Sequence, residues 1–358
     1  MIVQPIAVGG QSALRPAGPA ARAIGDLWDV MLVSGTIITV LVLLAFAWAL
    51  WHRRAPGFTP EADRPADARG EASNDESGGR SREGVGRPRT ERQGTGVMVG
   101  AGIVFPTIVL GVVLVFTLKA LAAISLPSGA VRTADALPAP GELVIKVTGR
   151  QYWWQVEYLD REPSKRFETA NELRIPVGRT VTVRLVSDDV IHSFWVPELQ
   201  GKMDLVPGRV NAMALNASRP GVFRGQCAEF CGVQHAKMAF VVVAEPPARY
   251  EAWAARQRES ARSVRDSAAS DDEATFLASG CALCHAVRGT PARGELGPDL
   301  THLATRLTLA AGTLPNRAGH LYGWIANPQA IKPGSKMPAT PLSTRDLHAI
   351  ARYLASLD

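Results

Sequence analysis

The sequence has little cysteine: four residues among 358, in two close pairs, Cys227/Cys231 and Cys281/Cys284. Both pairs lie beside histidines, which favours metal or cofactor attachment over a disulfide framework. Basic helices and nucleic-acid-reading motifs are also missing, so nucleic acid is not expected as a partner despite a net charge of +6. Residues 1–29 lack the apolar core and small-residue site of a cleavable signal, so none is expected there.

Charge is absent from two early blocks, Val30–Trp51 and Val97–Leu118. At 1.5 Å per residue the first block is about 33 Å long, enough to cross a hydrocarbon core of about 30 Å. Trp48 and Trp51 fit the positions of interfacial anchors. The blocks predict a transmembrane α-hairpin in a lipid bilayer, with helices over residues 30–51 and 97–121. Core helices of a soluble protein are the weaker alternative.

The segment between the blocks, residues 52–96, has almost no large apolar residues and is predicted to be a disordered loop. It carries nine arginines, whereas the segment before the first block has only Arg15 and Arg22. The positive-inside rule therefore places the loop in the cytoplasm. Both chain termini, including the N-terminal segment 1–29, are then expected on the outer side of a two-pass protein.

After the second block the texture changes twice. Short β-rich runs separated by Gly, Pro, Asp and Asn occupy residues 122–245, as in an antiparallel sandwich or barrel. Residues 246–270 are charged and rich in Ala and Arg, which predicts a partly helical linker. Residues 271–358 have a helical pattern that opens with an acidic first turn at Asp271–Glu273.

Soft ligands gather at the end of the β-rich region. His192 follows a turn, and the run from Cys227 to Met238 holds two thiols, an imidazole and a thioether. Such ligands favour copper. A mononuclear blue-copper site needs only one Cys, so the pair predicts two coppers bridged by both sulfurs. Each copper would take one imidazole, with a thioether and a backbone carbonyl as weak outer ligands. A disulfide or a Cys2His2 zinc site is the alternative. The predicted ligands are His192, Cys227, Cys231, His235 and Met238.

The second cysteine pair stands in the order Cys281-Ala-Leu-Cys284-His285, the attachment motif of c-type haem. Both thiols would join the haem covalently, and His285 would be an axial iron ligand. A thioredoxin-like redox pair is disfavoured because the surroundings are helical. Met337, the only Met after Met238, is the preferred distal ligand. Its rivals are His302, His320 and His348.

These motifs resemble the cytochrome c oxidase subunit II family with a fused cytochrome c domain. The resemblance rests on the copper motif and on QSALRPAGP, GRQYWW and DLVPGR, which begin at Gln11, Gly149 and Asp204. It implies a multidomain membrane protein: a transmembrane hairpin, an all-β cupredoxin sandwich and an all-α class I cytochrome c domain. Lys336-Met337-Pro338 resembles the distal loop of that class, and GPDL at Gly297 fits it too.

The resemblance also implies the function. The chain would be the subunit of a bacterial inner-membrane oxidase that passes electrons from cytochrome c through its haem c to the dinuclear copper A centre. They would continue to subunit I, where oxygen is reduced and protons are translocated; other oxidase subunits are further partners. Glu229 would give its carbonyl to copper and its carboxylate to a magnesium ion shared with subunit I. The aromatic residues Tyr152, Trp153 and Trp154 would assist electron transfer.

Two departures from the family pattern stand out. Relatives usually have Trp where this chain has Tyr152, and they often carry a Glu at the start of the second helix, where no acidic residue occurs between Arg92 and Asp135. A copper-handling membrane protein is the runner-up, but it would need no haem. A quinol oxidase subunit would lack the copper ligands, and a nitrous oxide reductase would add a propeller domain.

Overall fold

The structure is a computed structural model that describes residues 10–53, 96, 98–125, 133–261 and 267–358. The predicted cytoplasmic loop, residues 52–96, lies almost wholly outside these ranges. By its internal contacts the chain divides into two units, residues 26–118 and the remainder.

Two long apolar helices match the uncharged blocks. The first, α1 (Pro19–Arg53), begins before the predicted span, because nothing after Pro19 breaks an Ala-rich helix. The second, α3 (Phe105–Ile124), follows a π-helical turn, η2 (Gly100–Val104). Both have the length and apolar composition of a membrane span. Their apolar side chains are mostly exposed, as expected for surfaces that meet lipid.

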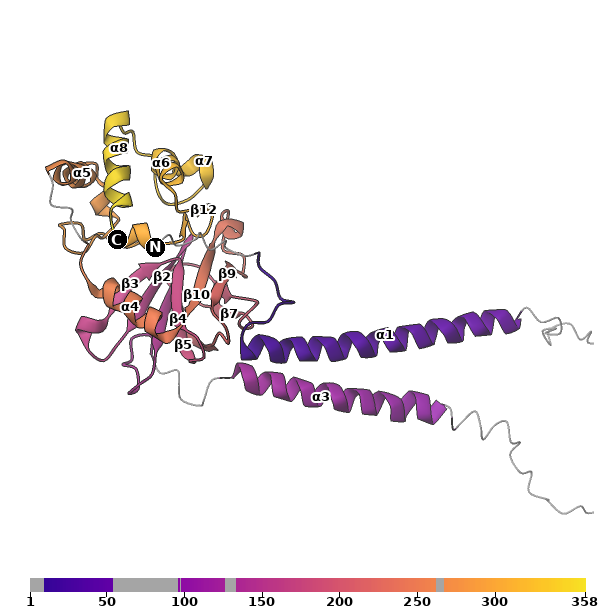
Figure 1. Cartoon of the computed structure of the whole chain (residues 1–358). Coiled ribbons are helices and arrows are strands. Elements are labelled where there is room, and N and C mark those ends of the chain that lie inside the picture. Colours follow the sequence, from indigo (N-terminus) through magenta and orange to yellow (C-terminus); the bar gives the residue numbers. More distant parts are fainter. Residues whose placement is uncertain (1–9, 54–95, 97, 126–132, 262–266) are drawn as a thin grey trace, which may run out of the picture. The chain divides into compact units, whose positions relative to one another are not determined.

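The β-rich region forms two five-stranded sheets (Figure 1). Their orders are β3-β2-β1-β5-β8 and β4-β10-β9-β6-β7. The pairs β1/β5 and β4/β10 are parallel, so the sandwich is not purely antiparallel as predicted. The strands are β1 (Val144–Arg150), β2 (Trp153–Leu159), β3 (Phe167–Ala170), β4 (Glu172–Pro176), β5 (Val181–Ser187), β6 (His192–Trp195), β7 (Met203–Leu205), β8 (Asn211–Leu215), β9 (Gly221–Cys227) and β10 (Ala239–Glu245).

Side-chain alternation explains the core of the sandwich. Alternate residues are buried along β2 and in the second half of β9, as expected where one face meets the opposite sheet. Trp154, Phe194, Phe223 and Phe240 are fully buried at its centre. Strand β10 is buried on both faces, because loops of the C-terminal domain cover its outer side. Two short 3-10 turns complete the sandwich, η3 (Pro163–Lys165) and η4 (His235–Lys237).

The start of the chain is also part of the sandwich. The Ala17 amide donates to the Glu198 carbonyl at 2.6 Å, and the Ser218 amide donates to the Ala17 carbonyl at 2.8 Å. Gly18 lies so close to this surface that an added Cβ would be 2.4 Å from the Leu199 carbonyl oxygen. The segment before α1 is therefore anchored to the folded β region.

Helix α4 (Pro247–Arg258) lies within the range predicted as a linker. Its Tyr250 and Trp253 belong to the core of the sandwich, where Trp253 contacts the rings of Tyr158 and Phe167. The connection between the two domains is thus confined to the residues between Arg258 and the next helix. Residues 262–266 of that connection lie outside the described ranges.

The C-terminal domain is mostly helical and has its own core, to which Phe276, Leu321, Ile350 and Tyr353 contribute. Its first helix starts at Ser267, four residues before the predicted acidic turn, because SAAS is compatible with a helix. Arg352 pairs with Asp272 at 2.7 Å and joins the first helix to the last. A two-stranded sheet, β11 (Thr308–Leu309) with β12 (Leu314–Pro315), was not predicted. The helices are α5 (Ser267–Ala278), η5 (Cys281–Leu283), η6 (Leu303–Thr305), α6 (Ala318–Ala326), α7 (Pro328–Ile331) and α8 (Thr344–Ala355).

Candidate metal and haem centres

Four predicted copper ligands form a chain of close contacts. The sulfurs of Cys227 and Cys231 are 3.8 Å apart. His192 Nδ1 lies 3.9 Å from the Cys227 sulfur, and His235 Nδ1 lies 3.7 Å from the Cys231 sulfur. The two thiols are therefore central, and each has one imidazole at its outer side. This arrangement suits two metal ions bridged by both sulfurs.

The two weak ligands approach the same pair of sulfurs. Met238 Sδ is 3.7 Å from the Cys231 sulfur, and the Glu229 carbonyl oxygen is 3.2 Å from the Cys227 sulfur. The strands explain this convergence. Cys227 ends β9 and pairs with Phe194 of β6, which begins at His192. The Cys227 amide donates to the Met238 carbonyl at 2.9 Å and closes the intervening loop.

The cluster is buried, which determines its electrostatics. His192, Cys227, Cys231 and Met238 are at most 2% exposed. The hydrogen bond between the two thiols holds the pKa of Cys227 well below its usual range and that of Cys231 well above it, so the pair readily supplies one thiolate, the form of cysteine that soft metals require. Burial opposes charge on His192, but hydrogen bonds to Asp189 and Cys227 outweigh it and raise the pKa of the imidazole.

Asp189 is a functional residue that the sequence analysis missed. Its Oδ1 lies 2.7 Å from His192 Nε2, which leaves Nδ1 facing the Cys227 sulfur. A carboxylate on the outer nitrogen of a metal-binding histidine fixes the tautomer and the ring orientation. An Asp three residues before the His was the available signal. This donor set of thiolates, oriented imidazole and thioether fits copper.

The residues of the predicted haem-attachment motif also lie close together. Gly280, in a left-handed conformation with φ of 80°, starts the η5 turn. The amides of Cys284 and His285 both donate to the Cys281 carbonyl, at 3.2 and 3.0 Å. His285 Nδ1 bonds to the Pro298 carbonyl at 2.8 Å and leaves Nε2 for iron. Burial lowers the pKa of His285, which favours the neutral imidazole that binds metal.

Close backbone approach fixes the proximal ring. A Cβ added at Gly297 would lie 2.6 Å from the His285 ring, so the GPDL segment packs directly on the imidazole. The two thiols, the oriented imidazole and this packing fit a covalently bound haem.

Met337 lies in the loop after α7 and is partly exposed, with its carbonyl accepting from Gln329 Nε2 at 2.7 Å. Its three rivals have other contacts. His302 Nε2 bonds to the Glu259 carbonyl at 3.1 Å, His320 Nδ1 bonds to the Pro315 carbonyl at 3.0 Å, and the His348 ring lies against Tyr322. The assignment of Met337 as distal ligand stays a prediction that these contacts favour.

Comparison with known proteins covers nearly the whole chain. Residues 160–245 match the family described as cytochrome c oxidase subunit II, periplasmic domain, and residues 273–358 match cytochrome c. Cytochrome c oxidase subunit 2 of Alkalihalophilus pseudofirmus is 34% identical over 352 residues, covering 97% of this chain and 90% of that relative. The chain belongs to the cytochrome c oxidase subunit II family.

Two further proteins are similar to parts of this chain. Subunit 2 of Bacillus sp. strain PS3 is 35% identical over 227 residues, which cover 60% of this chain and 62% of that relative. The crystal structure of the periplasmic domain of subunit II of the Bradyrhizobium japonicum cytochrome oxidase is 30% identical, covering 34% of this chain and 97% of that domain, with a TM-score of 0.31.

Membership confirms the predicted family, fold class and enzyme. This subunit II is part of a cytochrome c oxidase and has an electron-transfer role. Its family membership implies that it associates with subunit I and with other oxidase subunits. Its subunit II domain implies copper A, and its cytochrome c domain implies haem. With its two apolar helices it is a membrane protein with a periplasmic domain.

The three aromatic residues of subunit II after Gln151 face different surroundings. Tyr152 is 9% exposed and lies against the loop of residues 231–237, since a Cβ at Gly232 would be 2.5 Å from its hydroxyl. Trp153 is partly exposed, and the Arg150 guanidinium lies over its ring at 5.7 Å from the centroid. Trp154 is fully buried with its ring 5.9 Å from the His192 ring. Tyr152 and Trp154 therefore flank the copper cluster.

The loop that carries Met337 rests on the copper loop of subunit II. Lys237 Nζ donates to the Ile331 carbonyl at 2.6 Å, and Gln234 Nε2 donates to the Pro333 carbonyl. Lys336 Nζ lies 3.5 Å from Asp189 Oδ2, so the distal loop also reaches the carboxylate that orients His192. We call residues 231–237 the copper loop and residues 331–337 the distal loop.

A second group of contacts joins the same two domains. The Leu307 amide donates to Glu172 Oε2 at 2.8 Å, and Glu172 Oε1 pairs with Arg174 at 2.8 Å. The Ala239 amide donates to the Ala311 carbonyl at 3.0 Å, although Ala239 belongs to β10 of the sandwich. These contacts explain why the outer face of β10 is buried.

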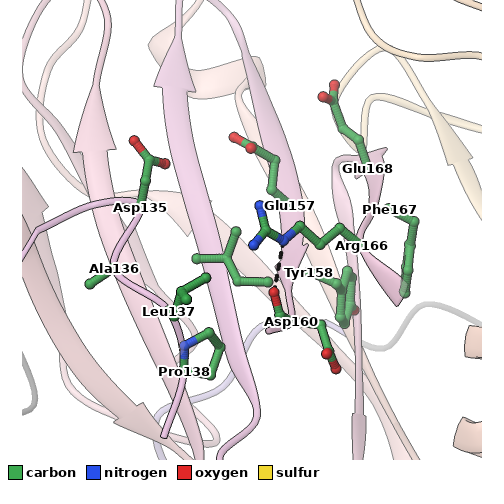
Figure 2. Close-up of a pocket in the computed structure, with 11 residues that line it drawn as sticks. Asp135, Ala136, Leu137, Pro138, Glu157, Tyr158, Asp160, Arg166, Phe167 and Glu168 are labelled. Atoms are coloured by element: carbon green, nitrogen blue, oxygen red, sulfur yellow. Dashed lines mark hydrogen bonds between the residues drawn. The ribbon is translucent and has the colours of Figure 1, made fainter. Parts of the chain in front are cut away.

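A cavity of about 350 Å³ lies elsewhere in the sandwich of subunit II, beside β2 and β3. Figure 2 shows its acidic wall, with Arg166 donating to the Asp160 carbonyl at 2.7 Å. Two of its carboxylates, Asp135 and Glu157, already pair with Lys146 at 2.8 and 2.9 Å. The cavity shares no residue with the copper cluster and is not part of that site.

Proposed function

We propose that this subunit accepts electrons from cytochrome c on its own haem domain, passes them to copper A and delivers them to subunit I, coupled to proton translocation. The observation that carries the proposal is the contact between the distal loop and the copper loop. It joins the predicted haem site to a cluster whose two sulfurs lie 3.8 Å apart, each beside an imidazole nitrogen. Two adjoining sites of this kind suit a one-electron relay within one chain.

In this proposal the sandwich residues hold the copper pair. Cys227, Cys231, His192 and His235 would be its main ligands, with the two thiols between the two imidazoles. Met238 Sδ and the Glu229 carbonyl complete the set. When bound, the copper pair supplies one-electron chemistry with little change in geometry. The residues support this by rigidity: the cluster is buried, Asp189 orients His192, and Gln151 Nε2 donates to the Cys231 carbonyl at 2.6 Å.

The C-terminal domain holds haem c in the same proposal. Cys281 and Cys284 would attach it covalently, and His285 and Met337 would bind the iron. Axial Met and His raise the haem potential, which suits a donor to copper. The neutral His285, held by the Pro298 carbonyl and packed against Gly297, supports the proximal assignment.

The contacts between the sandwich and the haem domain also support electron delivery through the fused haem domain. Tyr152 stands at the position where relatives usually have an electron-transferring Trp. It is 9% exposed, and its carbonyl accepts a hydrogen bond from Lys332 of the haem domain. The tether between Arg258 and α5 is short, and a short tether keeps donor and acceptor at an effective concentration on the order of millimolar.

We further propose that the Glu229 carboxylate reaches a magnesium ion shared with subunit I, and that the chain lies in the bacterial inner membrane with both termini periplasmic. The N-terminal segment supports this orientation, because Ala17 and Gly18 are bonded to the same sandwich that the family describes as periplasmic. The arginines of residues 52–96 support a cytoplasmic loop.

Metal analysis and electron paramagnetic resonance of the purified, metal-loaded chain test the copper assignment. We expect two coppers and a mixed-valence hyperfine pattern, which Cys231→Ser should reduce to a mononuclear pattern or abolish. Cys281→Ser is the matched control: it should disturb haem attachment and leave the copper pattern intact. An unchanged copper pattern in Cys231→Ser would contradict bridging by two sulfurs, and bound zinc would contradict copper altogether.

Stopped-flow reduction of the oxidase tests the route. We expect soluble cytochrome c to reduce the haem first and the copper second. An oxidase whose subunit II ends after Glu259, which keeps α4, should retain the copper spectrum and accept electrons much more slowly at low donor concentration. If this truncated enzyme accepts electrons as fast as the intact one, the fused domain is not the obligatory donor.

A further inference from the structure

Lys332 has an unusual position for a lysine. It follows α7 at the start of the distal loop and is 2% exposed. Lysines are almost never fully buried, because removing an amine from water is costly unless its N–H groups are hydrogen-bonded. A lysine buried at the boundary between two domains therefore needs a specific explanation.

The hydrogen bonds of Lys332 cross the domain boundary. Its Nζ donates to the Tyr152 carbonyl of the sandwich at 2.8 Å and to the Ala310 carbonyl of its own domain at 3.2 Å. Burial lowers the pKa of this amine to about 7. Either protonation state supplies the two N–H groups that these carbonyls accept, so the connection holds whether or not the amine is charged.

The residue that Lys332 holds lies directly on the copper site. The Tyr152 hydroxyl packs against Gly232 of the copper loop, where an added Cβ would be 2.5 Å away. The neighbouring Gln151 donates from Nε2 to the carbonyl of Cys231 at 2.6 Å. The backbone at Gln151 and Tyr152 is therefore connected to the copper loop through contacts at Cys231 and Gly232.

The contacts around Lys332 bring the same two loops together. Lys237 binds the Ile331 carbonyl, Gln234 binds the Pro333 carbonyl, and a Cβ added at Gly334 would lie 2.7 Å from Val233. Apart from Gln234, which is 7% exposed, those partners are partly or fully exposed, whereas Lys332 is only 2% exposed. Met337 ends the same distal loop. The hydrogen bonds of Lys332 therefore help to hold the backbone that carries the predicted distal ligand against the copper loop.

We propose that Lys332 is a positioning residue, which latches the haem domain onto the copper loop and thereby sets the rate of electron transfer between the two sites. The inference rests on the proposed function. With both groups bound, the transfer would oxidise ferrous haem iron to ferric iron and reduce the copper pair by one electron, with no bond formed and no proton required. Because electron tunnelling falls steeply with distance, a haem domain that dissociates from the copper loop transfers electrons more slowly.

Hydrogen exchange in the full, haem- and copper-loaded chain reports the latch directly. The amides of Ala239 and Leu307 are protected by acceptors on the opposite domain, Ala311 and Glu172. The amides of Cys227 and Val241 are protected within the sandwich, by Met238 and Asn171. We expect Lys332→Met to accelerate exchange at the first pair by about tenfold or more, because a buried carbonyl loses its donor, and to leave the second pair unchanged.

The rate of electron transfer from photoreduced haem to copper is the second readout. Lys332→Met should slow this step while the haem and copper spectra stay as in the wild type. Lys165→Met is the matched control, since Lys165 lies in the exposed η3 turn and pairs only with Glu162 among the contacts described. It should change neither exchange nor rate.

Lys332→Arg separates donation from packing. It keeps N–H donors at the end of a long side chain and should return both readouts toward wild-type values. The latch is overturned if Lys332→Met leaves either the exchange of the Ala239 and Leu307 amides or the transfer rate unchanged. It is also overturned if Lys332→Arg and Lys332→Met change both readouts to the same extent. Absence of haem-to-copper transfer in the wild-type chain would instead refute the proposed function.

Discussion

Helix α4 should be an integral part of the copper domain, and Trp253→Ala tests this. The Trp253 indole is 4% exposed and lies 5.3 Å from the Tyr158 ring and 5.5 Å from the Phe167 ring. The Arg174 guanidinium lies over it at 5.3 Å. Truncation of a buried aromatic residue to Ala removes about 3–5 kcal/mol, a large part of the 5–15 kcal/mol that stabilises a typical domain.

Thermal unfolding of the full chain, followed through the copper absorption, measures the effect. A loss of about 3 kcal/mol lowers the Tm of a domain of about 100 residues by about 12 °C or more. Arg256→Ala, on the exposed side of the same helix, should stay within about 0.5 kcal/mol of the wild type. If both variants unfold at the same temperature, α4 does not stabilise the sandwich and the tether begins at Pro246.

Two further predictions concern Met337 and Glu168. Met337→Ala should remove sulfur-to-iron absorption and lower the haem reduction potential, because an axial thioether favours ferrous iron; if His302→Ala has these effects instead, the distal assignment is wrong. Burial raises the pKa of Glu168 from its ordinary value of about 4.5 to about 7, so the folded protein holds this proton more tightly and its stability falls as pH rises from about 4.5 to 7. Glu168→Gln should therefore raise the Tm more at pH 8 than at pH 4.5, and an equal change at both pH values would show that Glu168 titrates normally.

The sequence alone determined the local features. The apolar spans, the Cys-Ala-Leu-Cys-His motif and the copper run from Cys227 to Met238 are each contained in one continuous stretch. Ligand types and spacings within such a stretch limit the possible chemistry before any fold is known. The structure brings His192 from a separate strand to the two cysteines of this run.

Only the tertiary structure decided what covers these motifs. The composition of residues 246–270 indicated a linker, because charged Arg and Glu residues outnumber the two aromatic residues of α4 that enter the sandwich core. The parallel pairing of β1 with β5 and of β4 with β10 joins strands distant in sequence, and alternation of side chains does not specify the partner strand. Lys332 looks like an ordinary surface lysine in the sequence. Its burial arises from residues on two domains, and such long-range contacts leave no local pattern from which they could be predicted.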